Sequence, residues 1–134
     1  MGAKHTLRRV VTGYDAEGKS IIVLDDKPEN GREPTEVWAT VTNAAEGASE
    51  FRVVDMPAGT RREMHRTDTV DYGIVLAGEV HLVLEQAETL LRAGDVVVQR
   101  GTSHAWYNRS DHAARMAFVN LSGQITDAGR CPEV

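Results

Sequence analysis

The sequence has few of the features that mark secreted or membrane-spanning proteins. Cys131 is the only cysteine among 134 residues, so no internal disulfide can form and nothing indicates an oxidising compartment. Residues 1–11 contain no apolar stretch of the kind a signal peptide needs, and no apolar run approaches the ~18 residues of a membrane span. We therefore expect a cytoplasmic protein that has no membrane partner.

Positive charge is also scarce. The chain has 15 Lys and Arg against 20 Asp and Glu, a formal net charge of −5, and its largest basic clusters are "TRRE" and "TLRR". A nucleic-acid-binding surface needs a larger basic patch, so we expect no nucleic-acid partner. A small-molecule partner fits this composition better.

Helical periodicity is missing as well. Short β-branched and aromatic runs instead recur every eight to twelve residues between turn residues, a spacing typical of an all-β sandwich or barrel. At 134 residues the chain is long enough for one such domain. We expect a single domain over residues 1–134, with an N-terminal strand extension over 1–45, a barrel core over 46–122 and a C-terminal tail over 123–134.

The stretch "HRTDTVDY" (65–72) raises the question of chemistry. If residues 63–71 form a strand, alternate side chains share one face, and that face carries Glu63, His65, Thr67, Thr69 and Asp71. Such an all-polar face either meets solvent or lines a hydrated cavity inside a barrel. The opposite face is also polar at its start, so the pattern leaves both possibilities open.

A second candidate stretch is "RGTSHAWYN", in which His104, Trp106 and Asn108 would share a face beyond the Gly101 turn. Large side chains such as Trp106 can form the apolar part of a pocket, although core packing is the commoner use. Arg100 could bind a substrate carboxylate through two hydrogen bonds. The residues that we expect to contact a substrate are Tyr72, Arg100, Trp106, Asn108, Met116 and Phe118.

Together these stretches resemble the two motifs of the cupin family. "GTRREMHRTDTVDYGIVLAG" is similar to the first motif, with Gly59, His65, Asp71 and Gly78 at its key positions. "GDVVVQRGTSHAWYN" is similar to the second, and the resemblance covers about residues 50 to 122. It implies a double-stranded β-helix, the cupin jelly-roll barrel, with extra N-terminal strands.

The resemblance also implies a metal site. In metal-binding cupins two histidines and a glutamate of the first motif and one histidine of the second hold a divalent ion, and His65 and His104 match two of these ligands. Thr67 stands in place of the second histidine, and Asp71 stands in place of the longer glutamate. His65, His104 and Asp71 would still make a set of two imidazoles and one carboxylate, suited to Fe, Zn, Mn or Ni.

We therefore expect a metal-dependent cupin enzyme, a lyase or oxygenase that acts on a small carbonyl or carboxylate compound. Glu63, Asp71 and Thr67 are its predicted catalytic residues, with Glu63 or a metal-bound water handling the proton. Two alternatives remain open: a metal-free acid–base isomerase or dehydratase that uses the same residues, and a small-ligand-binding module without turnover. The resemblance and the need to cover edge strands favour a homodimer.

Overall fold

The computed structural model describes residues 7–28, 35–41, 47–123 and 129, and every regular element in these ranges is a β-strand, as the sequence predicts. No helix in the described ranges is long and apolar enough to cross a membrane. The predicted C-terminal tail, 123–134, lies outside the described residues except for Gly123 and Gly129. The strands are β1 (Arg9–Tyr14), β2 (Ser20–Asp26), β3 (Thr35–Val41), β4 (Ala48–Met56), β5 (Val70–Ala77), β6 (Glu79–Val83), β7 (Glu88–Arg92), β8 (Val96–Arg100), β9 (Ala105–Tyr107) and β10 (Ala114–Ser122).

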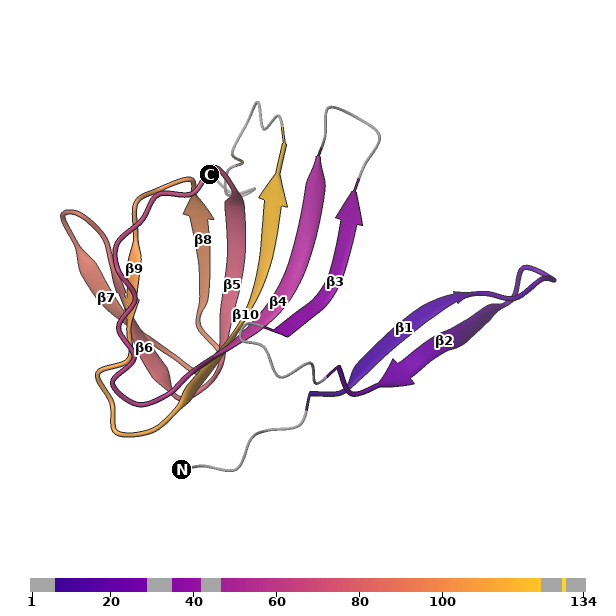
Figure 1. The fold of residues 1–134 in the computed structure, drawn as a ribbon, viewed down its shortest axis with the longest axis horizontal. Coiled ribbons are helices and arrows are strands. Elements are labelled where there is room, and N and C mark those ends of the chain that lie inside the picture. Colours follow the sequence, from indigo (N-terminus) through magenta and orange to yellow (C-terminus); the bar gives the residue numbers. More distant parts are fainter. Residues whose placement is uncertain (1–6, 29–34, 42–46, 124–128, 130–134) are drawn as a thin grey trace.

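Two antiparallel sheets face each other and form the body of the molecule (Figure 1). The larger sheet has the order β3-β4-β10-β5-β8, and the smaller has the order β7-β6-β9. The last strand, β10, therefore lies at the centre of the larger sheet, between β4 and β5. This arrangement brings residues far apart in the sequence onto one concave inner face.

The core lies between the two sheets because the apolar residues alternate along their strands. On β10 the buried residues Ala114, Met116 and Phe118 point inward, and Arg115 and Ala117 between them are less buried. Trp106 of β9 packs edge-on against Phe118, with ring centroids 5.6 Å apart. The buried cluster consists of Val54, Met56, Val75, Val80, Leu82, Trp106, Ala114, Met116 and Phe118.

Gly73 permits the inner face of β5 to approach β10 closely. A Cβ atom added at Gly73 would lie 2.8 Å from Cε1 of Phe118 and 3.0 Å from Cγ1 of Val97. Neither neighbour is free to move far, because Phe118 is buried in the core cluster and Val97 packs against that cluster. The glycine therefore sets the position of the Phe118 ring.

The segment between β4 and β5 differs from its prediction. Residues 57–69 form no regular strand and make two isolated antiparallel bridges, Arg61 to Tyr107 and His65 to His104. Loop hydrogen bonds hold the segment against β9, with Arg62 N donating to Trp106 O and Gly59 N donating to Asn108 O, both at 2.9 Å. These hydrogen bonds hold the segment in place, since it forms no continuous strand pairing with a sheet.

Strands β1 and β2 form a separate two-stranded sheet that stands away from the body (Figure 1). Paired hydrogen bonds join Arg9 to Asp26 (2.9 and 2.6 Å) and Arg8 to Asp25 (2.9 and 2.8 Å). The hydrogen bond from Arg9 lowers the pKa of the Asp26 carboxyl group. Arg9 also donates to the carbonyl of Val37 in β3, which ties the hairpin to the larger sheet.

Candidate functional site

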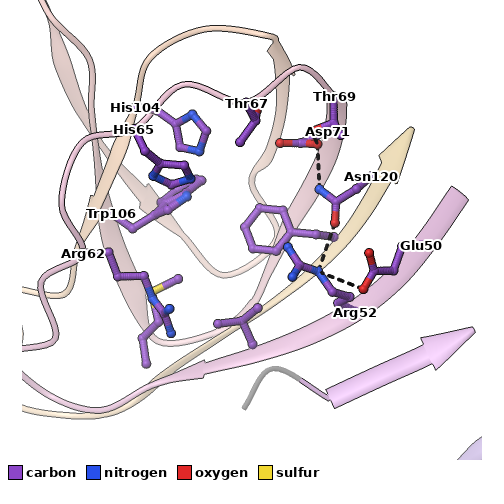
Figure 2. Close-up of a pocket in the computed structure, with 13 residues that line it drawn as sticks. Glu50, Arg52, Arg62, His65, Thr67, Thr69, Asp71, His104, Trp106 and Asn120 are labelled. Carbon is purple, nitrogen blue, oxygen red and sulfur yellow. Dashed lines mark hydrogen bonds and ion pairs between the residues drawn. The ribbon is translucent and has the colours of Figure 1, made fainter. Parts of the chain in front are cut away.

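A cavity of about 380 Å³ opens between the two sheets (Figure 2). Its floor is apolar, and its two side walls carry three of the titratable groups that the sequence singled out, His65, Asp71 and His104. We call it the central cavity. It is lined by Glu50, Arg52, Val54, Met56, Arg62, His65, Thr67, Thr69, Asp71, His104, Trp106, Phe118 and Asn120.

One wall of the central cavity carries a pair of imidazoles. His65 and His104 exchange both backbone hydrogen bonds, at 2.9 and 3.0 Å, and their ring centroids lie 4.7 Å apart. His104 is buried, with 4% of its surface exposed, whereas His65 lies at the exposed rim. The isolated bridge therefore brings together two side chains that are 39 positions apart in the sequence.

Each imidazole is held by a carbonyl two residues earlier. Nδ1 of His65 lies 3.2 Å from the Glu63 carbonyl oxygen, and Nδ1 of His104 lies 2.8 Å from that of Thr102. A carbonyl can only accept, so both Nδ1 atoms carry hydrogen in these contacts. In the neutral form, Nε2 of each ring then keeps its lone pair for a ligand or a proton.

The opposite wall is a polar row across four strands of the larger sheet. In the strand register, Glu50 of β4, Asn120 of β10, Asp71 of β5 and Gln99 of β8 lie side by side. We call these four residues the inner polar row. Figure 2 shows Asp71 and Asn120 across the cavity from the two histidines.

Asp71 is buried, with 5% of its surface exposed, and one of its oxygens is fully engaged. Oδ1 accepts hydrogen bonds from the Thr69 hydroxyl and from Asn120 Nδ2, both at 2.6 Å. Asn120 in turn accepts from Arg52 Nε at 3.0 Å. Oδ2 of Asp71 has no hydrogen-bond partner among the described residues, which leaves one carboxylate oxygen for a bound molecule.

Two further polar groups of the cavity have no partner in the described part of the chain. The Thr67 hydroxyl is buried without a hydrogen bond. The side chain of Arg62, on the exposed rim, forms neither a hydrogen bond nor an ion pair with another described residue. By contrast, Arg52 lies 3.9 Å from Glu50. Arg62 is thus a cavity cation without a paired carboxylate.

The predicted metal ligands do not form one cluster. In ranges 7–28, 35–41 and 47–123, no group of three or more His, Cys, Asp or Glu side chains is arranged to hold a metal ion. His65 and His104 offer two neighbouring nitrogen ligands, but Asp71 is held on the other wall by Thr69 and Asn120. Asp71 is one methylene shorter than a glutamate, and Thr69 and Asn120 hold it on the far wall, so it does not join the two imidazoles.

The structure places Glu63 and Arg100 outside the central cavity. Glu63 lies in the segment between the two isolated bridges, and its side chain lines a separate surface depression with Met64 and Tyr107. Arg100, at the end of β8, is exposed and lines another depression beside Arg66. The predicted strand over 63–71 would have put Glu63 on the His65 face, but this segment is not a regular strand.

Three other residues that were predicted to contact a substrate lie on the outer face of a sheet or in the buried interior. Tyr72 follows Asp71 on β5, so strand alternation turns it to the outer face, where 49% of its surface is exposed. Met116 is fully buried in the core cluster. Asn108 is also fully buried, and its Nδ2 donates to the carbonyls of Met56 (3.0 Å) and His112 (2.8 Å). None of these three side chains lines the central cavity.

The remaining predictions meet at the cavity, and the structure adds others. His65, Thr67, Asp71, His104, Trp106 and Phe118 all line it. Arg52, Arg62, Asn120 and Glu50 were missed. Strand alternation offered a signal for Asn120, which stands two positions beyond Phe118, and for Arg52, which shares a face with Val54 and Met56.

Sequence comparison identifies relatives of this chain. Residues 52–120 match the family model described as "Cupin domain". A phomopsin biosynthesis cluster protein of Diaporthe leptostromiformis is 51% identical over 80 residues, which cover 58% of this chain and 42% of that protein. A cupin-domain-containing oxidoreductase of Hypocrea virens is 31% identical over 151 residues, covering 90% of this chain and 77% of that protein. The match thus spans less than half of the length of the phomopsin cluster protein.

Solved structures share the fold. A Klebsiella pneumoniae protein with a double-stranded β-helix domain superposes with a TM-score of 0.58 at 24% identity, over 73% of this chain and 84% of that one. A cupin 2 conserved barrel protein of Salinispora arenicola gives a TM-score of 0.52 at 23% identity, over 70% of this chain and 78% of that one. These likenesses confirm the predicted double-stranded β-helix. The chain belongs to the cupin domain family.

Proposed function

We propose that this cupin is an enzyme that catalyses proton transfer on a small carbonyl or carboxylate compound bound in the central cavity. Isomerisation, dehydration and decarboxylation belong to this class of reaction. The observation that carries the proposal is the placement of two imidazoles, His65 and His104, across the cavity from the buried carboxylate of Asp71 (Figure 2). General acid–base catalysis needs titratable groups within hydrogen-bond reach of the substrate, and this arrangement offers them on two sides of the cavity.

The histidine pair supplies the first proton-transfer group. With Nδ1–H of each ring donated to a backbone carbonyl, Nε2 is the free atom that accepts a proton from the substrate. The antiparallel bridge fixes both rings, so little rearrangement is needed when the substrate binds. His65 lies at the rim and His104 is buried, which gives a proton a route between the cavity and solvent.

Asp71 supplies the second group. Its Oδ1 is occupied by Thr69 and Asn120, so Oδ2 is the atom that exchanges a proton with the far side of the substrate. The Thr67 hydroxyl, buried without a partner in the described residues, donates a hydrogen bond to a substrate oxygen. Arg62 binds a substrate carboxylate, since no described carboxylate neutralises it.

A metal-dependent oxygenase or lyase is the second candidate. Two observations favour it: the neighbouring Nε2 atoms of His65 and His104, and the names of relatives such as the cupin-domain-containing oxidoreductases of Hypocrea virens and Neurospora crassa. The absence of a clustered third ligand in the described ranges weighs against it, and so we assign no step to a metal. In either reaction the substrate is a small molecule, in line with relatives named for biosynthesis clusters.

Exchange of substrate hydrogen with D₂O tests the proposal on a panel of candidate compounds. Small 2-oxo and 3-hydroxy acids are incubated with the protein in D₂O and followed by proton NMR, before and after dialysis against a chelator. We expect deuterium incorporation or conversion that survives dialysis and that falls about 100-fold or more in Asp71→Asn. Glu63→Gln, a carboxylate outside the cavity, is the matched control and keeps its activity.

Two outcomes contradict the proposal. Activity that disappears on dialysis and returns with a divalent metal supports the metal-dependent candidate. If the Asp71→Asn and His104→Gln variants are folded and as active as the original protein, neither side chain takes part in the proton transfer. Elemental analysis of the native protein, done beside His65→Ala and His104→Ala, separates the two candidates further.

A further inference from the structure

Three polar groups near one end of the inner polar row lack hydrogen-bond partners. Nε2 of Gln99 is buried without a partner in the described part of the chain, and so is the hydroxyl of Thr67. Oδ2 of Asp71 is the third group, because only Oδ1 accepts the hydrogen bonds from Thr69 and Asn120. Buried polar groups in native proteins are nearly always paired, so three unpaired ones indicate a place where a bound molecule completes the hydrogen bonds.

These groups come from three elements that pack together. Asp71 of β5 and Gln99 of β8 are direct partners in the antiparallel register, and both are buried, with 5% and 3% of their surface exposed. Side chains of directly opposed residues share one face, with Cβ atoms about 5 Å apart. Thr67 approaches from the irregular segment, since its carbonyl oxygen would lie 3.5 Å from a Cβ atom added at Gly101, two residues after Gln99. We call Thr67, Asp71 and Gln99 the polar corner.

The chemistry of the polar corner selects a hydroxyl group. Oε1 of Gln99 accepts from the Thr102 hydroxyl at 2.8 Å, which leaves Nε2, an atom that only donates. The ionised Asp71 carboxylate only accepts. A ligand hydroxyl can accept from Nε2 and donate to Oδ2 at once, and the Thr67 hydroxyl can add a third hydrogen bond. A ligand carboxylate would instead meet the like charge of Asp71, and an ammonium group would give Gln99 no acceptor.

A different group fits the far part of the central cavity. The side chain of Arg62 forms neither a hydrogen bond nor an ion pair with another described residue, and a guanidinium group binds a carboxylate through two hydrogen bonds. Figure 2 shows Arg62 well apart from Thr67 and Asp71. The apolar part of the lining, which can cover a carbon skeleton, consists of Val54, Met56, Trp106 and Phe118.

We infer that the molecule bound in the central cavity is a hydroxy acid, with its carboxylate on Arg62 and its hydroxyl, several carbon atoms away, in the polar corner. The inference rests on the proposed function, since it takes this cavity as the substrate site. It makes Thr67 and Gln99 the residues that select the hydroxyl. A site that pairs a substrate hydroxyl discriminates against the same compound without it, because the buried groups of the site then stay unpaired.

Calorimetric titration of the whole chain with acids that differ only by a hydroxyl tests the inference. 6-Hydroxyhexanoate is compared with hexanoate, and 3-(4-hydroxyphenyl)propanoate with 3-phenylpropanoate. We expect the hydroxy acid to bind about 10-fold or more tightly than its counterpart in at least one pair. If the hydroxyl adds no affinity in either pair, or if none of the four acids binds, the inference is overturned.

Two variants identify the residues that select the hydroxyl. Thr67→Val and Gln99→Met keep the size of each side chain and remove its polar group, so each should lower the preference for the hydroxy acid about 5-fold or more. Thr67→Val should also raise the midpoint of urea unfolding, because a methyl group replaces a hydroxyl without a described partner. Thr60→Val removes a hydroxyl that donates to the Pro57 carbonyl in the same segment, and this matched control keeps the preference. Folded Thr67 and Gln99 variants that keep the full preference overturn the inference.

Failure of this inference and failure of the proposed function give different results. Binding that shows the hydroxyl preference without any deuterium exchange contradicts the proton-transfer proposal and supports the hydroxy-acid site. Exchange that is equally fast on acids with and without the hydroxyl supports proton transfer and contradicts the hydroxy-acid site.

Discussion

His65 and His104 are joined by two backbone hydrogen bonds, and their rings lie close together with tilted planes. Each donates its backbone N–H to the carbonyl of the other, at 2.9 and 3.0 Å, and the ring centroids lie 4.7 Å apart with the planes tilted by 53°. Through this bridge the irregular segment 57–69 places the His65 imidazole beside His104, the residue directly before β9. The position of the first histidine thus depends on the second.

Replacing Arg62 should weaken substrate binding more than turnover. Its guanidinium lines the cavity and has no partner among the described residues, so it can give two hydrogen bonds to a substrate carboxylate. We expect Arg62→Gln to raise KM about 10- to 100-fold, with a smaller effect on kcat. Steady-state kinetics with a carboxylate substrate and its neutral amide provides the comparison. An equal loss for both compounds would show that Arg62 does not recognise the charge.

Gly73→Ala should destabilise the fold and reshape the cavity floor. The new Cβ would lie 2.8 Å from Phe118 Cε1, so the ring or the strand must move. Overpacking of this kind costs about 1–3 kcal/mol in the free energy of unfolding, which urea denaturation measures. The double variant Gly73→Ala/Phe118→Leu relieves the clash and should recover part of the loss. If the double variant is less stable than the sum of the single effects, contact with Phe118 is not the cause.

Asn108→Ala should be strongly destabilising although the residue lies outside the cavity. Nδ2 donates to the carbonyls of Met56 and His112, and Oδ1 accepts from the backbone N–H and the hydroxyl of Ser110. Truncation leaves several buried polar groups unpaired, which should lower the free energy of unfolding by about 3 kcal/mol or more. Ser110→Ala, which removes one member of the network, should cost about 1 kcal/mol. Equal losses in the two variants would contradict this ranking.

Acid should loosen the β1–β2 hairpin through Asp26. The hydrogen bond from Arg9 holds the pKa of this carboxyl group below its ordinary value of 3.8. The pair therefore contributes its full stability above about pH 4 and loses it as the pH falls through the lowered pKa. Amide hydrogen exchange of β1 and β2 should show protection that falls in this acid range. Asp26→Asn should show a smaller step, because the Arg8–Asp25 pair of the same hairpin remains. A step of equal size in the variant would assign it to another group.

Part of the cavity lining can be predicted from the sequence because strand alternation has a fixed period. Phe118 and Trp106 were predicted to contact a ligand, and both line the cavity. Tyr72 was assigned to the site although it follows Asp71 directly, and the register of β5 turns it outward. His65, Thr67 and Asp71 line the cavity although the regular strand expected to align them is missing, and Glu63 of the same predicted face lies outside it.

The sequence by itself determined the all-β class and the cupin family, because period-two alternation, turn residues and motif spacing are local properties. Only the tertiary structure decided which polar residues meet. The inner polar row needs the register of β4, β10, β5 and β8, and it engages Asp71 with Asn120, 49 positions away. That contact draws the carboxylate away from His65 and His104, and it follows from strand pairing across the sheet, which the local pattern does not encode.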